Sequence, residues 1–321
     1  MQTRFSPELL ADPATAGSER VIRKCVHCGF CTATCPTYVI LGDELDSPRG
    51  RIYLIKEMLE RNETPSDEVV KHVDRCLSCL SCMTTCPSGV HYMHLVDHAR
   101  AYIEERYRRP LIERVIRSAL AWTLPHPARF RFMLNFARAG RPFAGVFARW
   151  RATRPLSAML SLAPRELPAP ATRQQVGEGT RGRVIMLQGC VEPVLRPAIR
   201  EAAERVLARA GFAIEYAAGE ACCGALVHHM GREAAALEAA RRNIDAWAPL
   251  VEKGDVRAIV ITASGCGTTL KKGGHMLKND PAYAEKAEKV SSLARDITEL
   301  LSEVDLPAQK PNGLKVAYHA A

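Results

Sequence analysis

A chain of 321 residues with a hydrophobic fraction of 47% has the material for two folded domains, which excludes bulk disorder. Its net charge is +9, and it contains neither a secretory signal nor an apolar run near the roughly 20 residues of a membrane-spanning helix. We therefore expect a cytoplasmic protein, in which twelve cysteines indicate metal or redox chemistry rather than a framework of disulfides.

The strongest pattern near the N-terminus is a repeated set of four cysteines. Each set has the spacing C-x2-C-x2-C-x3-C followed by proline, and the two sets are offset by 51 residues. The first set is Cys25, Cys28, Cys31 and Cys35, and the second is Cys76, Cys79, Cys82 and Cys86. This spacing is typical of bacterial ferredoxins that bind two 4Fe–4S clusters.

The spacing also indicates how the ligands divide. Three cysteines two residues apart can wrap around one cluster, whereas the fourth lies too far along the chain to reach the same cluster. A zinc site needs only four ligands and has no use for the third cysteine and the proline in both copies. The sequence therefore predicts two clusters with crossed ligands. The first is held by Cys25, Cys28, Cys31 and Cys86, and the second by Cys35, Cys76, Cys79 and Cys82.

Helices are predicted around these cysteine loops. Apolar residues at helical spacing mark residues 50–61, and Ser66 is an N-cap candidate for a helix that ends near residue 74. Residues 91–108 predict another helix, so residues 1–109 are expected to form a helical ferredoxin-like domain. Lys24 and Arg75 directly precede the two cysteine sets. Their positive charges could raise the reduction potentials of the clusters, or the two side chains are solvated and have no role.

Residues 110–182 are expected to be a basic, aromatic-rich helical connector that ends in a linker. Residues 106–154 contain twelve arginines, one acidic residue and no lysine, so the rest of the chain is close to neutral. No recognised motif for nucleic acid accompanies this charge, and nucleic acid is not expected as a partner. Two interpretations stay open: peripheral docking on an anionic membrane surface or a partner subunit, or helices with buried aromatics and solvated arginines. The aromatics are Trp122, Phe130, Phe132, Phe136, Phe143, Phe147 and Trp150.

From residue 183 onward, short apolar runs alternate with helical patterns. Strands are predicted at residues 184–187, 212–216, 258–262 and 314–318. Helices are predicted at residues 196–210, 232–247 and 282–301. This alternation favours parallel strands joined by crossover helices, so residues 183–321 are expected to form an α/β domain.

Four further cysteines follow the predicted strands: Cys190, Cys222, Cys223 and Cys266. Because ligands of open α/β sheets bind at the carboxyl ends of the strands, three loops could bring these sulfurs to one site. Three interpretations stay open: a third iron–sulfur site, a redox-active thiol site, or buried structural cysteines. His228 and His229 follow the cysteine pair, either as ligands or proton carriers or as partly exposed loop residues.

The order Cys190, Cys222-Cys223-Gly224, Cys266 resembles the cysteine-rich CCG domain of heterodisulfide reductases and related flavin-linked dehydrogenase subunits. The stretches CVHCGFCTATCPTY, DSPRGRIYLIK and CLSCLSCMTTCPSGV precede it. Over roughly residues 20–321 the whole chain is similar to the iron–sulfur subunits of glycolate oxidase, also called glycolate dehydrogenase.

The resemblance implies an α+β multidomain protein that is the electron-transfer subunit of an oxidoreductase complex. A partner flavoprotein, which alone carries FAD, would oxidise glycolate to glyoxylate. Electrons would then pass through two 4Fe–4S clusters to a quinone-type acceptor, on the cytoplasmic side of the inner membrane. No G-x-G-x-x-G follows a predicted strand, and no residue of the chain is a candidate for substrate catalysis.

Two features depart from the family pattern. Ala263 stands where the pattern has the first cysteine of a C-x-x-C, which leaves Cys266 alone. A second CCG half would begin after His319, so a C-terminally truncated chain is expected. The rival interpretations are a heterodisulfide reductase-like catalytic subunit, the iron–sulfur subunit of a lactate or glycerol-3-phosphate dehydrogenase, and an adapter with structural clusters.

Overall fold

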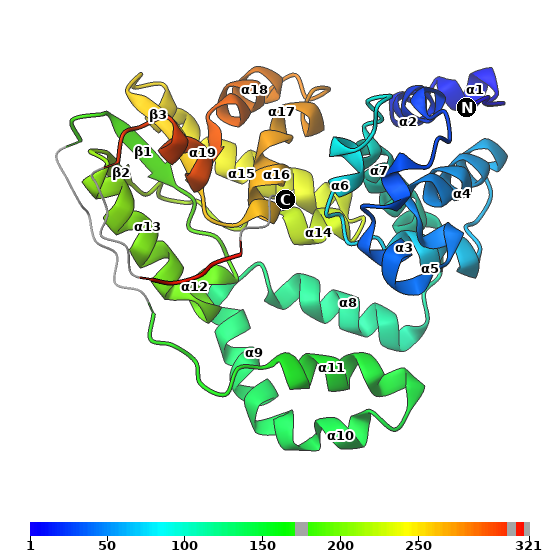
Figure 1. Cartoon of the computed structure of the whole chain (residues 1–321), viewed down its shortest axis with the longest axis horizontal. Coiled ribbons are helices and arrows are strands. Elements are labelled where there is room, and N and C mark those ends of the chain that lie inside the picture. Colours follow the sequence, from blue (N-terminus) through cyan, green and yellow to red (C-terminus); the bar gives the residue numbers. More distant parts are fainter. Residues whose placement is uncertain (171–178, 307–312, 318–321) are drawn as a thin grey trace. The chain divides into compact units, whose positions relative to one another are not determined.

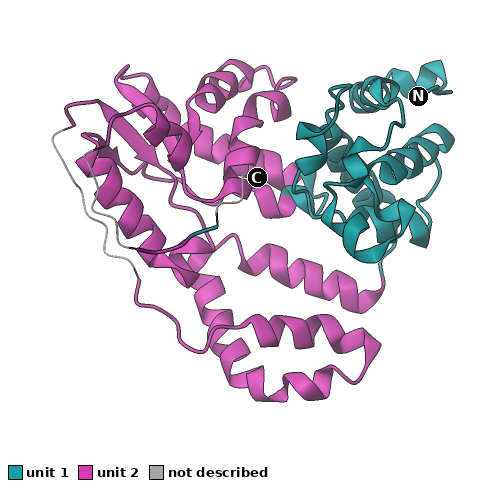
Figure 2. Cartoon of the chain, in the orientation of Figure 1, with its two compact units in different colours: residues 1–109, 228–233, 316–321 teal, residues 110–227, 234–315 magenta. Residues whose placement is uncertain are grey.

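The computed structural model describes residues 1–170, 179–306 and 313–317, which fall into two compact units (Figures 1 and 2). Unit 1 holds residues 1–109, 228–233 and the described residues from 316 onward, and unit 2 holds residues 110–227 and 234–315. Residues 110–182 therefore share a unit with the sheet that follows them, and the division into three domains stays a prediction.

Unit 1 is helical (Figure 1), and each of its two cysteine loops follows one helix and leads into the next. The three helices expected from the sequence are present as α4 (Pro48–Arg61), α5 (Asp67–Asp74) and α7 (Tyr92–Arg106), and the Ser66 hydroxyl accepts the Val69 N–H as an N-cap. The helices are α1 (Pro7–Leu10), α2 (Pro13–Lys24), α3 (Pro36–Leu41), α4 (Pro48–Arg61), α5 (Asp67–Asp74), α6 (Ser81–Thr84) and α7 (Tyr92–Arg106), with 3₁₀ turns at Phe30–Thr32 and Glu44–Asp46.

The core of unit 1 is formed by the apolar faces of its longer helices. Helix α2 packs on α7, and α4 packs on both α5 and α7. Ile22, Ile55, Val73, Leu95 and Ile103, which come from four different helices, are completely buried. Cys25 and Cys82 belong to the same apolar cluster, so the cysteine loops are part of this core and not appendages on its surface.

Unit 2 begins with helices rich in arginine. They are α8 (Leu111–Thr123), α9 (Pro127–Gly140), α10 (Ala144–Phe147) and α11 (Arg154–Leu162), with 3₁₀ turns at Arg141–Phe143 and Arg151–Thr153. The interpretation with buried aromatics is wrong for most of the segment, because only Phe130 is buried and Phe147 is half-buried. The exposed aromatics are Trp122, Phe132, Phe136, Phe143 and Trp150. No helix in the described part of the chain combines the length and apolarity needed to cross a bilayer.

A four-stranded parallel sheet forms the centre of unit 2, in the order β2-β1-β3-β4. The strands are β1 (Arg183–Met186), β2 (Ala213–Glu215), β3 (Val256–Ile261) and β4 (Ala294–Asp296). The helices around them are α12 (Glu192–Leu195), α13 (Pro197–Arg209), α14 (Ala225–His229), α15 (Glu233–Val251), α16 (Ser264–Lys271), α17 (Gly273–Met276), α18 (Ala284–Ser292) and α19 (Ile297–Ser302).

The sheet is covered on both faces, as its nearly continuous runs of Val and Ile require. Ile185 and Ile259 point to the face that packs on Trp247 of α15. Val184 and Val260 alternate to the other face, against α13 and α19. The expected parallel α/β arrangement is therefore present, although the chain as a whole is mostly helical.

The prediction of the fourth strand is wrong. Residues 313–317 form no strand and are exposed, while residue 318 lies outside the described residues. The fourth strand is β4, which lies inside the stretch predicted as one helix at residues 282–301. A strand of three residues is too short to show the alternating pattern on which strand prediction depends. Its pairing with β3 is decided by the tertiary structure.

Candidate iron–sulfur and thiol sites

The two cysteine loops of unit 1 repeat one backbone conformation. His27 and Gly29, on either side of the second cysteine in the first set, have φ of 56° and 87°. Ser78 and Leu80, on either side of the second cysteine in the second set, have φ of 51° and 59°. Residues other than glycine seldom adopt this left-handed backbone conformation. Turns of this kind present backbone N–H groups to anionic groups such as iron–sulfur clusters. The repeat is therefore one of structure as well as of sequence.

A cavity of unit 1 brings together the cysteines predicted for the first cluster. Its lining includes Cys25, Cys28 and Cys31 from the first set and Cys86 from the second. Cys82 also lines it. The fourth cysteine of the second set therefore lies beside the first three cysteines of the first set, as crossed ligation requires.

The cysteines predicted for the second cluster meet around Cys82. Burial raises the pKa of the Cys82 thiol to about 12, and the negative charges of Cys76, Cys31, Cys79 and Cys35 add to the effect. Several thiolates gathered in a buried place need a cation, because their charges repel one another. Iron supplies that charge and binds the deprotonated sulfur, so the donor set fits iron–sulfur clusters.

Cys35 lies beside a buried polar network centred on Asp46. The Asp46 carboxylate accepts hydrogen bonds from Arg51 Nη2 at 3.2 Å, Arg75 Nη1 at 2.8 Å and His72 Nδ1 at 2.9 Å. Burial acts to raise the pKa of Asp46, but the hydrogen bonds from His72 and Arg75 outweigh it and hold that pKa below its usual range. Arg75, which the sequence left either as a residue that raises a cluster potential or as a solvated side chain, thus has a defined partner in Asp46.

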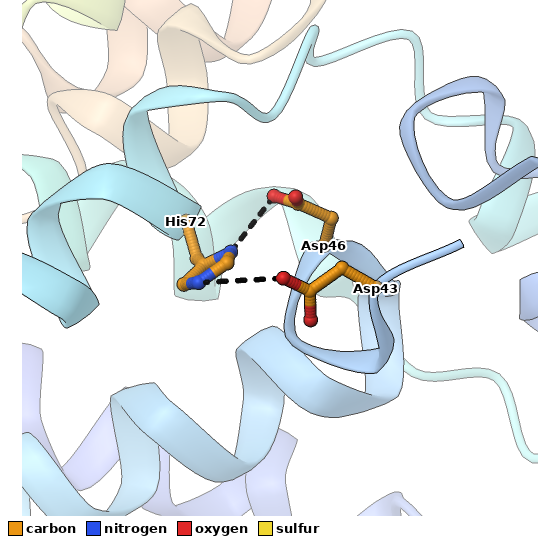
Figure 3. Close-up of side chains that lie close together, drawn as sticks. All are labelled: Asp43, Asp46 and His72. Carbon is orange, nitrogen blue, oxygen red and sulfur yellow. Dashed lines mark hydrogen bonds and ion pairs between the residues drawn. The ribbon is translucent and has the colours of Figure 1, made fainter. Parts of the chain in front are cut away.

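Asp43, Asp46 and His72 have the spacing of a candidate metal site (Figure 3). One ligand atom from each lies within 4.8 Å of the other two. However, two guanidinium groups already occupy the Asp46 carboxylate, and they would repel a cation. The cluster is therefore an ion-pair network that braces the turn at Glu44–Asp46 against α5.

Around Cys76, α7 contributes two buried polar side chains. Arg100 donates to the Cys76 carbonyl at 2.6 Å and to the Ser78 hydroxyl at 2.6 Å. The Tyr92 hydroxyl donates to Cys76 Sγ at 3.7 Å. Sequence patterns did not single out Arg51, Tyr92 or Arg100. For Arg51 there was a signal, because an arginine stands on the apolar face of the predicted helix.

The second group of cysteines lies at the carboxyl edge of the sheet in unit 2. Cys190 follows β1, Cys222 and Cys223 follow β2, and Cys266 lies in α16 after β3. The Cys190 and Cys222 sulfurs are 3.3 Å apart. Hydrogen bonding with Cys190 and Cys223 lowers the pKa of Cys222 and raises the pKa of both partners, while Cys223 is also hydrogen-bonded to Cys266. The three loops therefore converge.

The four sulfurs form a chain of contacts rather than the corners of a tetrahedron. Around one zinc ion, with Zn–S bonds of about 2.3 Å, four sulfurs would all lie within about 4 Å of one another. Among the described residues no three cysteine sulfurs lie mutually within 4.8 Å, since that criterion is met only by the Asp43 set. The arrangement fits a larger iron–sulfur group or a thiol site better than a single zinc ion.

Side chains of α15 hold the loop that carries the cysteine pair. Asn243, fully buried, accepts the Ala221 N–H at 2.9 Å and donates to the Cys222 carbonyl at 3.1 Å. Trp247 Nε1 donates to Glu220 at 2.9 Å. A Cβ on Gly224, which has φ of 83°, would lie 3.0 Å from Ala239 Cβ. These polar anchors carry no motif, so sequence reasoning missed them.

His228 and His229 pair with a carboxylate of unit 1. Both lie in the segment of unit 1 that follows the cysteine pair, and both face Asp97 of α7. His228 Nε2 is 3.1 Å from one Asp97 oxygen, and His229 Nδ1 is 3.7 Å from the other. The two imidazoles are thus partners of a buried carboxylate.

Two protein families match the chain. The 4Fe–4S dicluster domain matches residues 24–90, and the cysteine-rich domain called CCG matches residues 184–271. Fold, cysteine sets and family matches together define an iron–sulfur protein with a two-cluster domain and a cysteine-rich α/β domain. No solved structure matches the chain.

Curated relatives narrow this class. The chain is 45% identical to the glycolate oxidase iron–sulfur subunit of Escherichia coli, over 99% of this chain and 75% of the relative. It is 32% identical to the probable glycolate oxidase iron–sulfur subunit of Bacillus subtilis, over 89% of this chain and 67% of the relative. Lactate utilization protein A of Bacillus thuringiensis is 27% identical over 38% of this chain and 48% of the relative. The chain belongs to the family of glycolate oxidase iron–sulfur subunits.

Proposed function

We propose that this chain is the electron-transfer subunit of a flavin-dependent 2-hydroxy-acid dehydrogenase that oxidises glycolate to glyoxylate. The observation that carries the proposal is the convergence of cysteines from both repeated sets within unit 1. The substrate is assigned by the 45% identity to the Escherichia coli relative. Substrate oxidation belongs to a partner flavoprotein that holds FAD, and this chain is assigned no catalytic residue.

The eight cysteines of unit 1 are proposed as the ligands, in the crossed arrangement. Cys25, Cys28, Cys31 and Cys86 hold the first cluster, and Cys35, Cys76, Cys79 and Cys82 hold the second. When bound, each cluster carries one electron, so a pair of clusters divides a two-electron oxidation into single-electron steps towards a quinone-type acceptor. The protein holds the thiolates, keeps the two sets adjacent and determines their electrostatic surroundings.

Metal analysis and EPR on anaerobically purified protein test this proposal. We expect at least eight irons per chain and two clusters that can be reduced. Cys86→Ser should damage only the first cluster, and Cys35→Ser only the second. Ser302→Ala, at a position that holds no proposed ligand, serves as a control that leaves both clusters intact. Zinc in place of iron at these sulfurs would contradict the cluster assignment.

Turnover of the complex tests the substrate. The chain, assembled with its flavin subunits, should support reduction of a quinone by glycolate. Lactate and glycerol 3-phosphate are the competing substrates. Faster quinone reduction with either of them would keep the electron-transfer role but contradict the assignment of glycolate.

We further propose that Cys190, Cys222, Cys223 and Cys266 bind a third iron–sulfur group. The convergence of three loops and the lowered pKa of Cys222 support this assignment, because iron binds the thiolate form. We expect more than eight irons per chain. The iron above eight should be lost in Cys222→Ser and kept in Ser302→Ala. Four titratable thiols with no additional iron would instead favour a redox thiol site of the heterodisulfide reductase type.

We also propose that residues 111–162 attach to an anionic membrane surface. Exposed aromatics between exposed arginines, such as Trp150 between Arg149 and Arg151, suit the headgroup region of a bilayer. Each arginine near anionic lipid contributes about 1 kcal/mol, so several of them suffice for peripheral attachment.

Flotation with vesicles tests this attachment. The protein should float with vesicles that contain phosphatidylglycerol, and high salt should release it. Trp150→Ser and the pair Arg149→Gln and Arg151→Gln should weaken the association. The pair Lys286→Gln and Lys289→Gln on α18 removes the same charge elsewhere and should have little effect. Equal behaviour on neutral vesicles, or binding to the flavin subunit alone, would contradict the proposal.

A further inference from the structure

The sulfur of Cys35 has a buried positive charge beside it. Arg51 on α4 is 1% exposed, and its Nη1 lies 3.9 Å from Cys35 Sγ. Nη1 and Nη2 both lie 3.1 Å from Thr37 Oγ1, which is itself 3.2 Å from the same sulfur. The guanidinium is fixed in this place because its Nε donates to the His72 carbonyl at 2.6 Å.

The acidic neighbour of Arg51 is shared with a second arginine. Asp46 carries one negative charge, while Arg51 and Arg75 bring two positive charges to it. The remaining carboxylate nearby, Asp43, has a side chain that is 41% exposed, so water screens its charge. The Arg75 side chain is 42% exposed, so water screens its charge in the same way. The charged group that remains in a buried place next to a ligand of the second cluster is the Arg51 guanidinium, whose Nη1 faces the Cys35 sulfur.

A second donor reaches the same cluster from α7. The Tyr92 hydroxyl lies 3.7 Å from Cys76 Sγ, and the side chain is buried. A tyrosine hydroxyl is protonated at neutral pH, so it donates a hydrogen bond to this sulfur. Arg100 fixes the same loop through the Cys76 carbonyl.

The first set of cysteines has different surroundings. The guanidinium beside it belongs to Arg49, whose side chain is 33% exposed and is bound through Nε and Nη2 to Glu44. The Cys31 sulfur receives a hydrogen bond from the Arg49 backbone rather than from its side chain. Solvent and an adjacent carboxylate therefore weaken the Arg49 charge at the first cluster. The Met1 ammonium group also lies near this set, but it donates to the Cys25 carbonyl at 2.6 Å and not to a sulfur.

We propose that Arg51 and Tyr92 give the cluster of Cys35, Cys76, Cys79 and Cys82 the higher reduction potential of the two. Hydrogen bonds and positive charge at the ligand sulfurs stabilise the reduced cluster, which carries one more negative charge. An electron that enters at the first cluster then moves downhill to the second. The inference rests on the ligand assignment proposed above.

Redox titration followed by EPR tests the inference on the full chain with both clusters loaded. The wild type should show two midpoint potentials. Arg51→Gln should lower the higher midpoint potential by about 59 mV, which is a tenfold change in the one-electron reduction equilibrium. The lower midpoint potential should not change. Tyr92→Phe, which removes one hydroxyl from a buried ring, should lower the same potential by a smaller amount.

Matched variants separate this effect from a general disturbance. Arg49→Gln removes a half-buried guanidinium near the first set, and Tyr102→Phe removes a hydroxyl that donates to the Glu63 carbonyl. Neither should lower the higher potential. If the Arg51→Gln variant does not bind both clusters, the shift of the higher midpoint potential in Tyr92→Phe tests the inference. A shift of the lower potential, or none in either test variant, overturns the inference, whereas iron below eight per chain refutes the ligand assignment itself.

Discussion

Asn243 is a single buried side chain that holds the loop of the paired cysteines. Its amide group both accepts and donates, to the Ala221 N–H and the Cys222 carbonyl, and the residue has no exposed surface. Backbone groups in an irregular loop need such partners, because they have no ladder of their own. The geometry of the thiol site thus depends on a residue of the neighbouring helix.

Replacing Asn243 with alanine should destabilise unit 2. Two buried backbone groups would lose their partners, which costs about 2–5 kcal/mol in total. Chemical unfolding followed by tryptophan fluorescence measures the change, since Trp247 lies in the same core. Glu238→Ala, at an exposed position on the same helix, should change the free energy of unfolding by no more than about 0.5 kcal/mol. Similar losses in both variants would contradict this role for Asn243.

At the scale of elements, α4 and the preceding 3₁₀ turn fit closely only because of a glycine. A Cβ on Gly50 would lie 2.1 Å from the Glu44 carbonyl oxygen. Ser47 begins the helix, since its hydroxyl accepts the Gly50 N–H at 3.0 Å. This packing brings Arg51 on α4 to Cys35, so a backbone contact determines the surroundings of the second cluster.

Two glycine-to-alanine replacements in helices of unit 1 should have opposite effects. Gly50→Ala forces α4 away from the turn and should cost about 1–3 kcal/mol or more. Gly17→Ala in α2 meets no atom within 4 Å and should stabilise the helix by about 0.5–1 kcal/mol. Thermal unfolding under anaerobic conditions compares them. Tolerance of Gly50→Ala with an unchanged EPR spectrum would refute the proposed packing.

A charged cap separates β4 from α19, the two elements that sequence reasoning merged into one helix. Asp296 and Glu299 form a capping box, and a hydrogen bond from Lys271 lowers the pKa of Glu299. A carboxyl group whose pKa is lowered by folding stabilises the protein above its unfolded pKa, and this contribution is lost as the pH falls through the folded pKa.

Stability should therefore decline as the pH falls below about 4.5, and Glu299→Gln should flatten that decline. Glutamine can still close the capping box, so the variant removes only the charge. Urea unfolding at pH 6 and at pH 3.5 gives the comparison. Glu285→Gln on α18 is the control, and an equal flattening there would show that overall charge is responsible.

At the scale of the whole molecule, the two units rely on different sources of stability. The sheet of unit 2 has apolar cores on both faces. In unit 1, Cys25 and Cys82 are part of the apolar core itself. Because metal-binding free energy contributes to folding when the ligands lie in the core, unit 1 should depend on its clusters.

Removal of iron should consequently loosen unit 1 and spare the sheet of unit 2. Hydrogen exchange on the full chain, before and after chelation, should show lost protection in α4 and α7 and retained protection in β1 and β3. Equal loss in both units would indicate that the molecule unfolds as one body, and no loss in either would show that the clusters do not support the fold.

The sequence by itself determined the parts of this protein that depend on local spacing. The two cysteine sets, their capped helices, the alternation of strands and helices after residue 183 and the family membership were all readable, because each depends on residues a few positions apart.

Only the tertiary structure decided which polar side chains meet the cysteines. Arg51 reaches Cys35 across 16 positions, and Asn243 reaches Cys222 across 21. It also decided that β4 pairs with β3 and that most aromatics of residues 111–162 face outward. These features follow from packing between distant segments, which no local pattern encodes.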